Sequence, residues 1–189
     1  MDLLERKKLT LLDPALWDDR NDAEIISAYK EHKKIESLMA VCFSYGDETI
    51  HHWKTFSSGT SGCVIEFNAE RLFEQIDSIK GLKHDKVEYR KLSDIEDENT
   101  IIDIDRLPFT KRWPYRCEEE YRIIIELDAK ATFYEIPIEL DTINRITISQ
   151  QMPRPIYNTI KSHLKEVWKN PDKRISHSTL YENKRWINH

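Results

Sequence analysis

The sequence is poor in glycine and in the motifs that glycine supports. Only four of its 189 residues are glycine, which argues against a glycine-rich loop that cradles phosphate groups. No GxxxxGK[ST], GxGxxG or GxSxG pattern occurs, so the signatures of P-loop, Rossmann and α/β-hydrolase proteins are missing. The 29 lysines and arginines are outnumbered by 34 aspartates and glutamates, and the formal net charge of -5 gives no general attraction to nucleic acid. We therefore expect no nucleic-acid partner.

Cysteine is scarce as well, and long apolar runs are missing. The three cysteines, Cys42, Cys63 and Cys117, are an odd number without CxxC spacing, so we expect no disulfide among them. No window approaches the ~20 apolar residues of a membrane span. The N-terminal segment MDLLERKKLT also lacks the apolar stretch of a signal peptide. The sequence therefore predicts a cytoplasmic protein without a membrane partner.

What the chain does contain is an alternation of strand and helix patterns. Its length fits one domain over residues 1–189. Continuous apolar runs and period-two alternation predict strands, whereas apolar residues at helical spacing behind a capping residue predict helices. Strands are expected at 38–44, 63–67, 85–89, 121–127, 132–136, 143–149 and 173–179, and helices at 23–29, 48–56, 69–79 and 155–168. This alternation predicts an α+β fold, with a twisted mixed β-sheet of about six strands flanked by helices.

The most informative segment is Glu118-Glu119-Glu120-Tyr121-Arg122, directly before three isoleucines. If a strand begins here, its two-residue period places Glu118, Glu120 and Arg122 on one face and Glu119 on the other. Two carboxylates on one face repel each other unless they are used or neutralised. The first interpretation is therefore a pair of functional carboxylates.

The second interpretation is an ion-pair network without a chemical role. Arg122 would then pair with Glu120, and Arg112 or Arg116 would pair with Glu118. Both interpretations stay open at this point, because ion-pair networks imitate functional sites. A Glu120 that is ionised and free in a cleft would favour an enzyme. A Glu120 bound to Arg122 on a closed surface would favour a binding module.

A second cluster, His51-His52-Trp53, lies on the helix expected over 48–56. Adjacent helical residues point about 100° apart, so the two histidines are poorly placed to chelate one ion. No third ligand stands four residues from either of them. We therefore expect no metal cofactor here. Trp53 is interpreted as a buried core anchor with one histidine at its edge, and a histidine that faces a substrate is the alternative.

A third cluster, KRWPYR over 111–116, interleaves cations with aromatic residues. Such a combination suits a phosphate, a nucleotide or a single-stranded nucleic acid. The alternative is a solvated loop whose Trp113 folds back onto the core. Two prolines, Pro108 and Pro114, predict that 107–114 is a loop rather than part of a sheet interior.

Several motifs are informative as an ordered set. They are LTLLDPALWDDRND, then AVCFSYGDETIHHW followed by GCVIEF, then LPFTKRWPYRCEEEYRI, and finally IPIELDTINRITIS. In this order they resemble a large prokaryotic domain family of unknown activity, whose members tend to lie near phage-defence and mobile elements. The resemblance covers nearly the whole chain. One departure is the start, because many members have a strand with tyrosine and arginine where this chain has little more than Leu3-Leu4-Glu5-Arg6.

The order of elements is also similar to that of ADP-ribosyltransferases, in which a serine-bearing strand, a short helix, another strand and an E-x-E strand follow one another. This resemblance implies NAD as the substrate. It implies that Glu120 binds the ribose and stabilises an oxocarbenium ion, that Glu118 orients the acceptor, and that Ser44 is an orienting residue. Further candidates for ligand binding are His51, His52, Lys111, Arg112, Arg116, Arg122 and Arg20. The basic residue of the first strand in such enzymes has only Arg6 and Arg20 as candidate counterparts here.

Two functions are therefore expected. The first is an NAD-binding, ADP-ribosyltransferase-like effector domain of a defence or toxin system, with a protein as one candidate acceptor. The second is a non-catalytic module of a prokaryotic defence system that senses a nucleotide or a partner protein through the segment 111–116.

Overall fold

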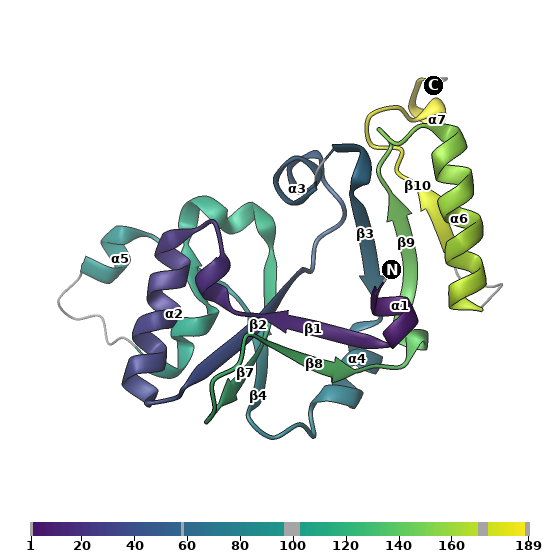
Figure 1. The fold of residues 1–189 in the computed structure, drawn as a ribbon. Coiled ribbons are helices and arrows are strands. Elements are labelled where there is room, and N and C mark those ends of the chain that lie inside the picture. Colours follow the sequence, from purple (N-terminus) through teal and green to yellow (C-terminus); the bar gives the residue numbers. More distant parts are fainter. Residues whose placement is uncertain (1, 58, 97–102, 170–173, 188–189) are drawn as a thin grey trace. The chain divides into compact units, whose positions relative to one another are not determined.

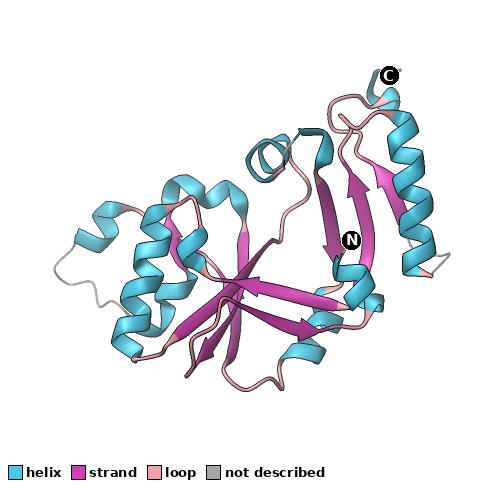
Figure 2. Ribbon diagram, in the orientation of Figure 1, coloured by secondary structure: helices cyan, strands magenta, loops and turns pink. Residues whose placement is uncertain are grey.

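The computed structural model describes residues 2–57, 59–96, 103–169 and 174–187 (Figure 1). Helices and strands are mixed along the chain, which confirms the α+β class (Figure 2). Contacts divide the chain into two compact units. We call Leu9–Gly46 together with Ile76–Ile136 the central unit, and Met1–Lys8, Asp47–Gln75 and Pro137–His189 the terminal unit. A single domain over 1–189 stays a prediction.

The frame of the central unit is a five-stranded sheet with the order β4-β7-β2-β1-β8. Its strands are β1 (Lys8–Leu12), β2 (Ser37–Ser44), β4 (Leu82–Lys86), β7 (Glu120–Leu127) and β8 (Phe133–Pro137). β7 pairs antiparallel with both β2 and β4. Ile123, Ile124 and Ile125 of β7 are all buried. Successive side chains of a strand point to opposite faces, so both faces of β7 are covered.

One face of this sheet packs against the helix α2 (Arg20–Lys33). Ile26 and Tyr29 of the helix form a buried cluster with Leu38, Ala40 and Ile124 of the sheet. The remaining elements of the unit are short: η1 (Pro14–Leu16), β5 (Glu88–Arg90), α5 (Leu92–Glu96), η3 (Ile104–Phe109), β6 (Thr110–Arg112) and η4 (Trp113–Glu118). β5 and β6 pair with each other in parallel.

The terminal unit contains a three-stranded sheet with the order β10-β9-β3. Its strands are β3 (Cys63–Phe67), β9 (Ile143–Ile148) and β10 (Arg174–His177). β9 runs antiparallel to β3 and parallel to β10, so this sheet is mixed. The helix α6 (Arg154–Trp168) runs beside β9 and β10 (Figure 1). Its side chains Tyr157, Leu164 and Trp168 are buried in the core of the unit. The other elements are α1 (Asp2–Arg6), α3 (Ile50–Phe56), η2 (Gly59–Ser61), α4 (Ala69–Ile76), η5 (Leu140–Thr142) and α7 (Lys184–Ile187).

The strands are distributed differently from the one sheet expected. They form sheets of five, three and two strands. The strand expected over 85–89 is divided at Val87, which lies between β4 and β5 and whose N–H still donates to the carbonyl of Glu120 (2.9 Å), next in register on the β7 side. The loop expected over 107–114 contains the short strand β6, because Pro108 and Pro114 flank this strand and do not interrupt it.

Two expectations about the whole chain can be compared with the structure directly. Cys42, Cys63 and Cys117 are free, as expected. Among the described residues, no helix combines the length and the apolar character that crossing a bilayer requires. Of the strand expected over 173–179, the part Arg174–His177 is present, and residue 173 lies outside the described residues.

Candidate functional site

The ends of β2 and β7 bring Ser44 and Glu120 together. Ser44 is the cross-strand partner of Glu120, and Cys42 is the partner of Arg122 two residues further along. Cross-strand partners of an antiparallel pair lie on the same face of the sheet. The four side chains therefore share one face. They differ in exposure, since Ser44 and Cys42 are exposed, whereas Glu120 and Arg122 are buried.

Glu118 does not belong to the strand, which corrects the expected single face of three residues. It ends the 3-10 helix η4, and Glu119 after it adopts a left-handed conformation with φ 45° and ψ 49°. This turn still directs Glu118 toward Glu120, because Nζ of Lys111 contacts both: it lies 2.6 Å from Oε2 of Glu118 and 3.1 Å from Oε2 of Glu120. The exposed Glu119 turns away from them, toward Gly46.

Arg122 is the centre of this arrangement. Its Nε and Nη2 donate to the two carboxylate oxygens of Glu120 (2.5 and 3.1 Å). Its Nη1 and Nη2 donate to the two oxygens of Asp22 (2.9 and 2.5 Å), and Nη1 also donates to the carbonyl of Pro108 (2.9 Å). These five hydrogen bonds match the five N–H groups of a guanidinium. The ring of Trp17 lies 5.0 Å from its central carbon. Every donor of the side chain is thus used within the protein.

Asp22 is the functional partner that sequence reasoning missed. The cap of α2 is Asp19, whose side chain accepts from the N–H of Asn21 (3.1 Å). Asp22 lies in the first turn of the helix and is only 3% exposed. An arginine inside an apolar strand needs a buried anion. The sequence did contain a signal for such a partner, because Arg122 directly precedes three isoleucines and its charge would need a buried anion there.

We call Asp22, Lys111, Glu118, Glu120 and Arg122 the Arg122 cluster. When all five are ionised, three carboxylates face two cations, so one negative charge is in excess. Burial alone would raise the pKa of Glu120, but the hydrogen bonds and charge of Arg122 and the charge of Lys111 outweigh it and lower this pKa to about 2.

The pKa of Asp22 shifts in the opposite direction to that of Glu120. Burial raises the pKa of Asp22 above its ordinary value, even though Arg122 and Lys111 oppose this shift. Burial would lower the pKa of Lys111, but the surrounding carboxylates raise it. As the pH falls, Asp22 therefore takes up a proton before Glu120 does.

The basic run divides between the inside and the outside of the unit. Lys111 points inward, whereas Arg112 and Arg116 do not reach Glu118, so the expected pairing of either arginine with Glu118 is wrong. Trp113 is 41% exposed and does not fold back onto the core. The guanidinium of Arg116 lies 4.9 Å from its ring centroid, and Nζ of Lys91 lies 5.4 Å from it.

The remaining candidates lie elsewhere. Arg20 is exposed at the start of α2 and lines an open hollow with Trp17 and Asp18, outside the Arg122 cluster. His51 and His52 lie on α3 in the terminal unit, where Nε2 of His52 is buried without a hydrogen-bond partner within the described ranges. Among the residues that the structure describes, no three histidines, cysteines, aspartates or glutamates are arranged to hold a metal ion.

Comparison with protein-family models, with curated proteins and with solved structures found no significant match to this chain. Neither the resemblance to a prokaryotic defence-associated family nor the resemblance to ADP-ribosyltransferases is therefore tested by a relative. The function is argued from the geometry of the residues alone.

Proposed function

We propose that this protein is a non-catalytic binding module that recognises a nucleotide through the surface around Trp113. The observation that carries the proposal is an exposed tryptophan between two cations, Arg116 and Lys91. Within the described part of the chain, no carboxylate pairs with the side chains of Lys91, Arg112 or Arg116. We call Lys91, Arg112, Trp113 and Arg116 the Trp113 surface.

This surface has the two chemical features that a nucleotide requires. An exposed indole offers a face on which a base stacks, which contributes about 1–3 kcal/mol per base in other proteins. Unpaired guanidinium groups bind phosphate oxygens through two parallel hydrogen bonds. Lys91 and Arg116 lie 5.4 and 4.9 Å from the ring centroid, so a base stacked on the part of the indole that they leave exposed would have its phosphates close to them.

The hydrogen bonds and the burial of Glu120 also favour a binding module over an enzyme. Both of its carboxylate oxygens accept hydrogen bonds from Arg122 or Lys111, and the residue is 6% exposed. These three hydrogen bonds take up most of the roughly four acceptor sites of a carboxylate, so little of Glu120 is left for a ligand. The Arg122 cluster therefore acts as the support of the Trp113 surface, since Lys111 of the cluster adjoins Arg112 and Glu118 ends the 3-10 helix that begins at Trp113.

Isothermal titration calorimetry with ATP and NAD tests this proposal. We expect binding that weakens about tenfold or more when Trp113 is replaced by alanine, because the stacking energy is lost. Arg116→Gln should weaken binding of ATP more than binding of adenosine, because it removes a contact to phosphate.

Trp186→Ala is the matched control, since Trp186 is 86% exposed and belongs to the terminal unit. Binding that is absent at millimolar nucleotide, or equal in Trp113→Ala and the wild type, would refute the proposal. The resemblance to a family whose members lie near phage-defence elements supports a more specific proposal, in which the binding module belongs to a prokaryotic defence or toxin system.

A second candidate is glycosyl transfer from NAD, as in ADP-ribosyltransferases. The observation that favours it is the pairing of Ser44 with Glu120, which matches the order of residues in those enzymes. In this reaction the bond between ribose C1′ and the nicotinamide nitrogen breaks, nicotinamide leaves, and an acceptor oxygen or nitrogen bonds to C1′ and loses its proton. Glu120 would have to exchange part of its contact with Arg122 or Lys111 for the ribose.

Incubation with NAD, followed by mass spectrometry of released nicotinamide, tests this candidate. Release is expected to disappear in Glu120→Gln and to fall about tenfold in Ser44→Ala. Ser44 is exposed, so Ser44→Ala keeps the fold and separates lost chemistry from lost stability. If the wild-type protein releases no nicotinamide above a blank, the candidate is rejected and the binding module stands.

A further inference from the structure

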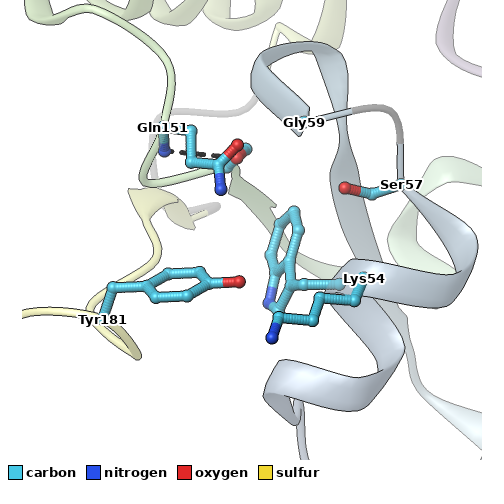
Figure 3. A pocket seen from close by; sticks show the side chains of 7 residues that line it. Lys54, Ser57, Gly59, Gln151 and Tyr181 are labelled. Carbon is cyan, nitrogen blue, oxygen red and sulfur yellow. Dashed lines mark hydrogen bonds between the residues drawn. The ribbon is translucent and has the colours of Figure 1, made fainter.

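The terminal unit has a hollow of its own, lined by Trp53, Lys54, Gly59, Ser149, Gln151 and Tyr181 among others (Figure 3). Its volume is about 220 Å³. The ammonium group of Lys54, the carboxamide of Gln151 and the hydroxyl of Tyr181 are directed toward the same space (Figure 3). The residues come from three separate segments of the sequence, so folding of the unit brings them together.

One wall of this hollow is held in place before any ligand arrives. Trp53 is 6% exposed, and its Nε1 donates to Oε2 of Glu48 (3.0 Å). The same oxygen accepts from the hydroxyl of Ser178 (3.3 Å). A ligand that contacts a fixed indole loses less free energy to the ordering of the protein. The aromatic wall is therefore ready for an apolar ring face.

The side-chain polar groups of Lys54, Gln151 and Tyr181 at the hollow are available to a ligand. Within the described residues, Lys54 has no carboxylate partner, and the side chains of Gln151 and Tyr181 make no hydrogen bond. Gln151 is nevertheless confined, because a Cβ atom at Gly59 would lie 3.3 Å from its Oε1. Among the described residues that line the hollow, Lys54 is the charged one, and Glu48, whose carboxylate is bound to Trp53 and Ser178, does not belong to the lining. The hollow therefore suits an anion.

We infer that this hollow binds a small phosphorylated ring compound, the chemical class of sugar phosphates and nucleoside monophosphates. Lys54 is placed to contact the phosphate as a point charge. Tyr181 offers an exposed aromatic face to the ring and Trp53 offers the small part of its indole that is exposed, while Gln151 offers both a donor and an acceptor to hydroxyl or amide groups. The volume of about 220 Å³ accommodates a sugar phosphate or part of a nucleoside monophosphate, and it is below that of sites for larger ligands. This site is independent of the Trp113 surface, which lies in the central unit.

Calorimetric titration of the full chain with glucose 6-phosphate and with AMP tests the inference, with glucose and adenosine as uncharged counterparts. We expect both phosphates to bind and both uncharged compounds to bind at least tenfold more weakly, because a charge-assisted contact is lost (about 1.4 kcal/mol per factor of ten). Lys54→Met keeps the length of the side chain and should weaken both phosphates by about tenfold or more. Lys165→Met, an exposed lysine of α6 outside the hollow, is the matched control and should change nothing.

Comparison of the two ligands distinguishes sugar phosphates from nucleotides as the class that the site binds. Equal affinity for glucose 6-phosphate and AMP assigns the site to sugar phosphates, whereas tighter binding of AMP assigns it to nucleotides whose base contacts the aromatic wall. The inference is overturned if neither phosphate binds at low millimolar concentration, or if Lys54→Met binds as the wild type does. It is also overturned if Trp113→Ala, and not Lys54→Met, removes the binding of AMP, because the Trp113 surface would then account for it.

Discussion

Replacement of Arg122 by methionine is expected to lower the free energy of unfolding by about 3–5 kcal/mol. The guanidinium is fully buried and donates five hydrogen bonds. Without it, Asp22 and Glu120 stay buried with Lys111 as the remaining cation of the cluster, so most of their desolvation is uncompensated. Urea denaturation followed by circular dichroism measures the loss as a shift of the midpoint at constant slope.

Two further variants make the result specific. Arg116→Met removes an exposed arginine and should change the free energy of unfolding by less than about 0.5 kcal/mol. Adding Asp22→Leu to Arg122→Met should recover part of the loss, because it removes a buried carboxyl group that has lost its partner. A loss below about 1 kcal/mol for Arg122→Met, within the range of ordinary substitutions, would contradict a central role for this side chain.

Trp53→Ala is expected to cost about 3–5 kcal/mol of unfolding free energy, as truncation of large aromatic residues in cores does. Trp53 is buried, as its sequence pattern predicted. The substitution leaves a cavity beside Gly62, where a Cβ atom would lie 3.3 Å from the indole ring. It also removes the N–H that donates to Glu48. Thermal unfolding monitored by circular dichroism, together with urea denaturation, measures the cost.

Trp53→Phe and Trp186→Ala complete this series. Trp53→Phe keeps much of the buried volume and loses the hydrogen bond, so its cost should fall between the wild type and Trp53→Ala. Trp186 is 86% exposed, and Trp186→Ala should leave stability nearly unchanged. Equal costs for Trp53→Ala and Trp186→Ala would mean that burial of Trp53 does not stabilise the unit.

The elements that could be predicted are those whose signal is local. The runs of β2 and β7 are apolar over most of their length, and strand propensity and burial both favour the same assignment. The pairing of Arg122 with Glu120 was also within reach, because residues two apart on a strand share a face.

The rest of the site depends on contacts that no short segment encodes. Asp22 and Arg122 are 100 positions apart in the sequence, and only the packing of α2 on the sheet joins them. The left-handed Glu119 has no sequence signal either, since glycine and asparagine are the residues that usually mark that conformation. The inward Lys111 and the outward Arg112 follow from the alternation of β6, a three-residue strand that was expected to be a loop.

The five-donor saturation of Arg122 has a consequence for how this protein can change through evolution. A lysine at position 122 would have three donors on one nitrogen and could not bridge two carboxylates and the carbonyl of Pro108 in the same geometry. A neutral residue at position 22 or 120 would likewise leave guanidinium donors buried without acceptors. Single substitutions are therefore expected to destabilise the protein more than simultaneous ones that remove a cation together with an anion. In descendants of the chain, we therefore expect positions 22, 120 and 122 to change together. This covariation would be more informative than conservation of any one of the three residues.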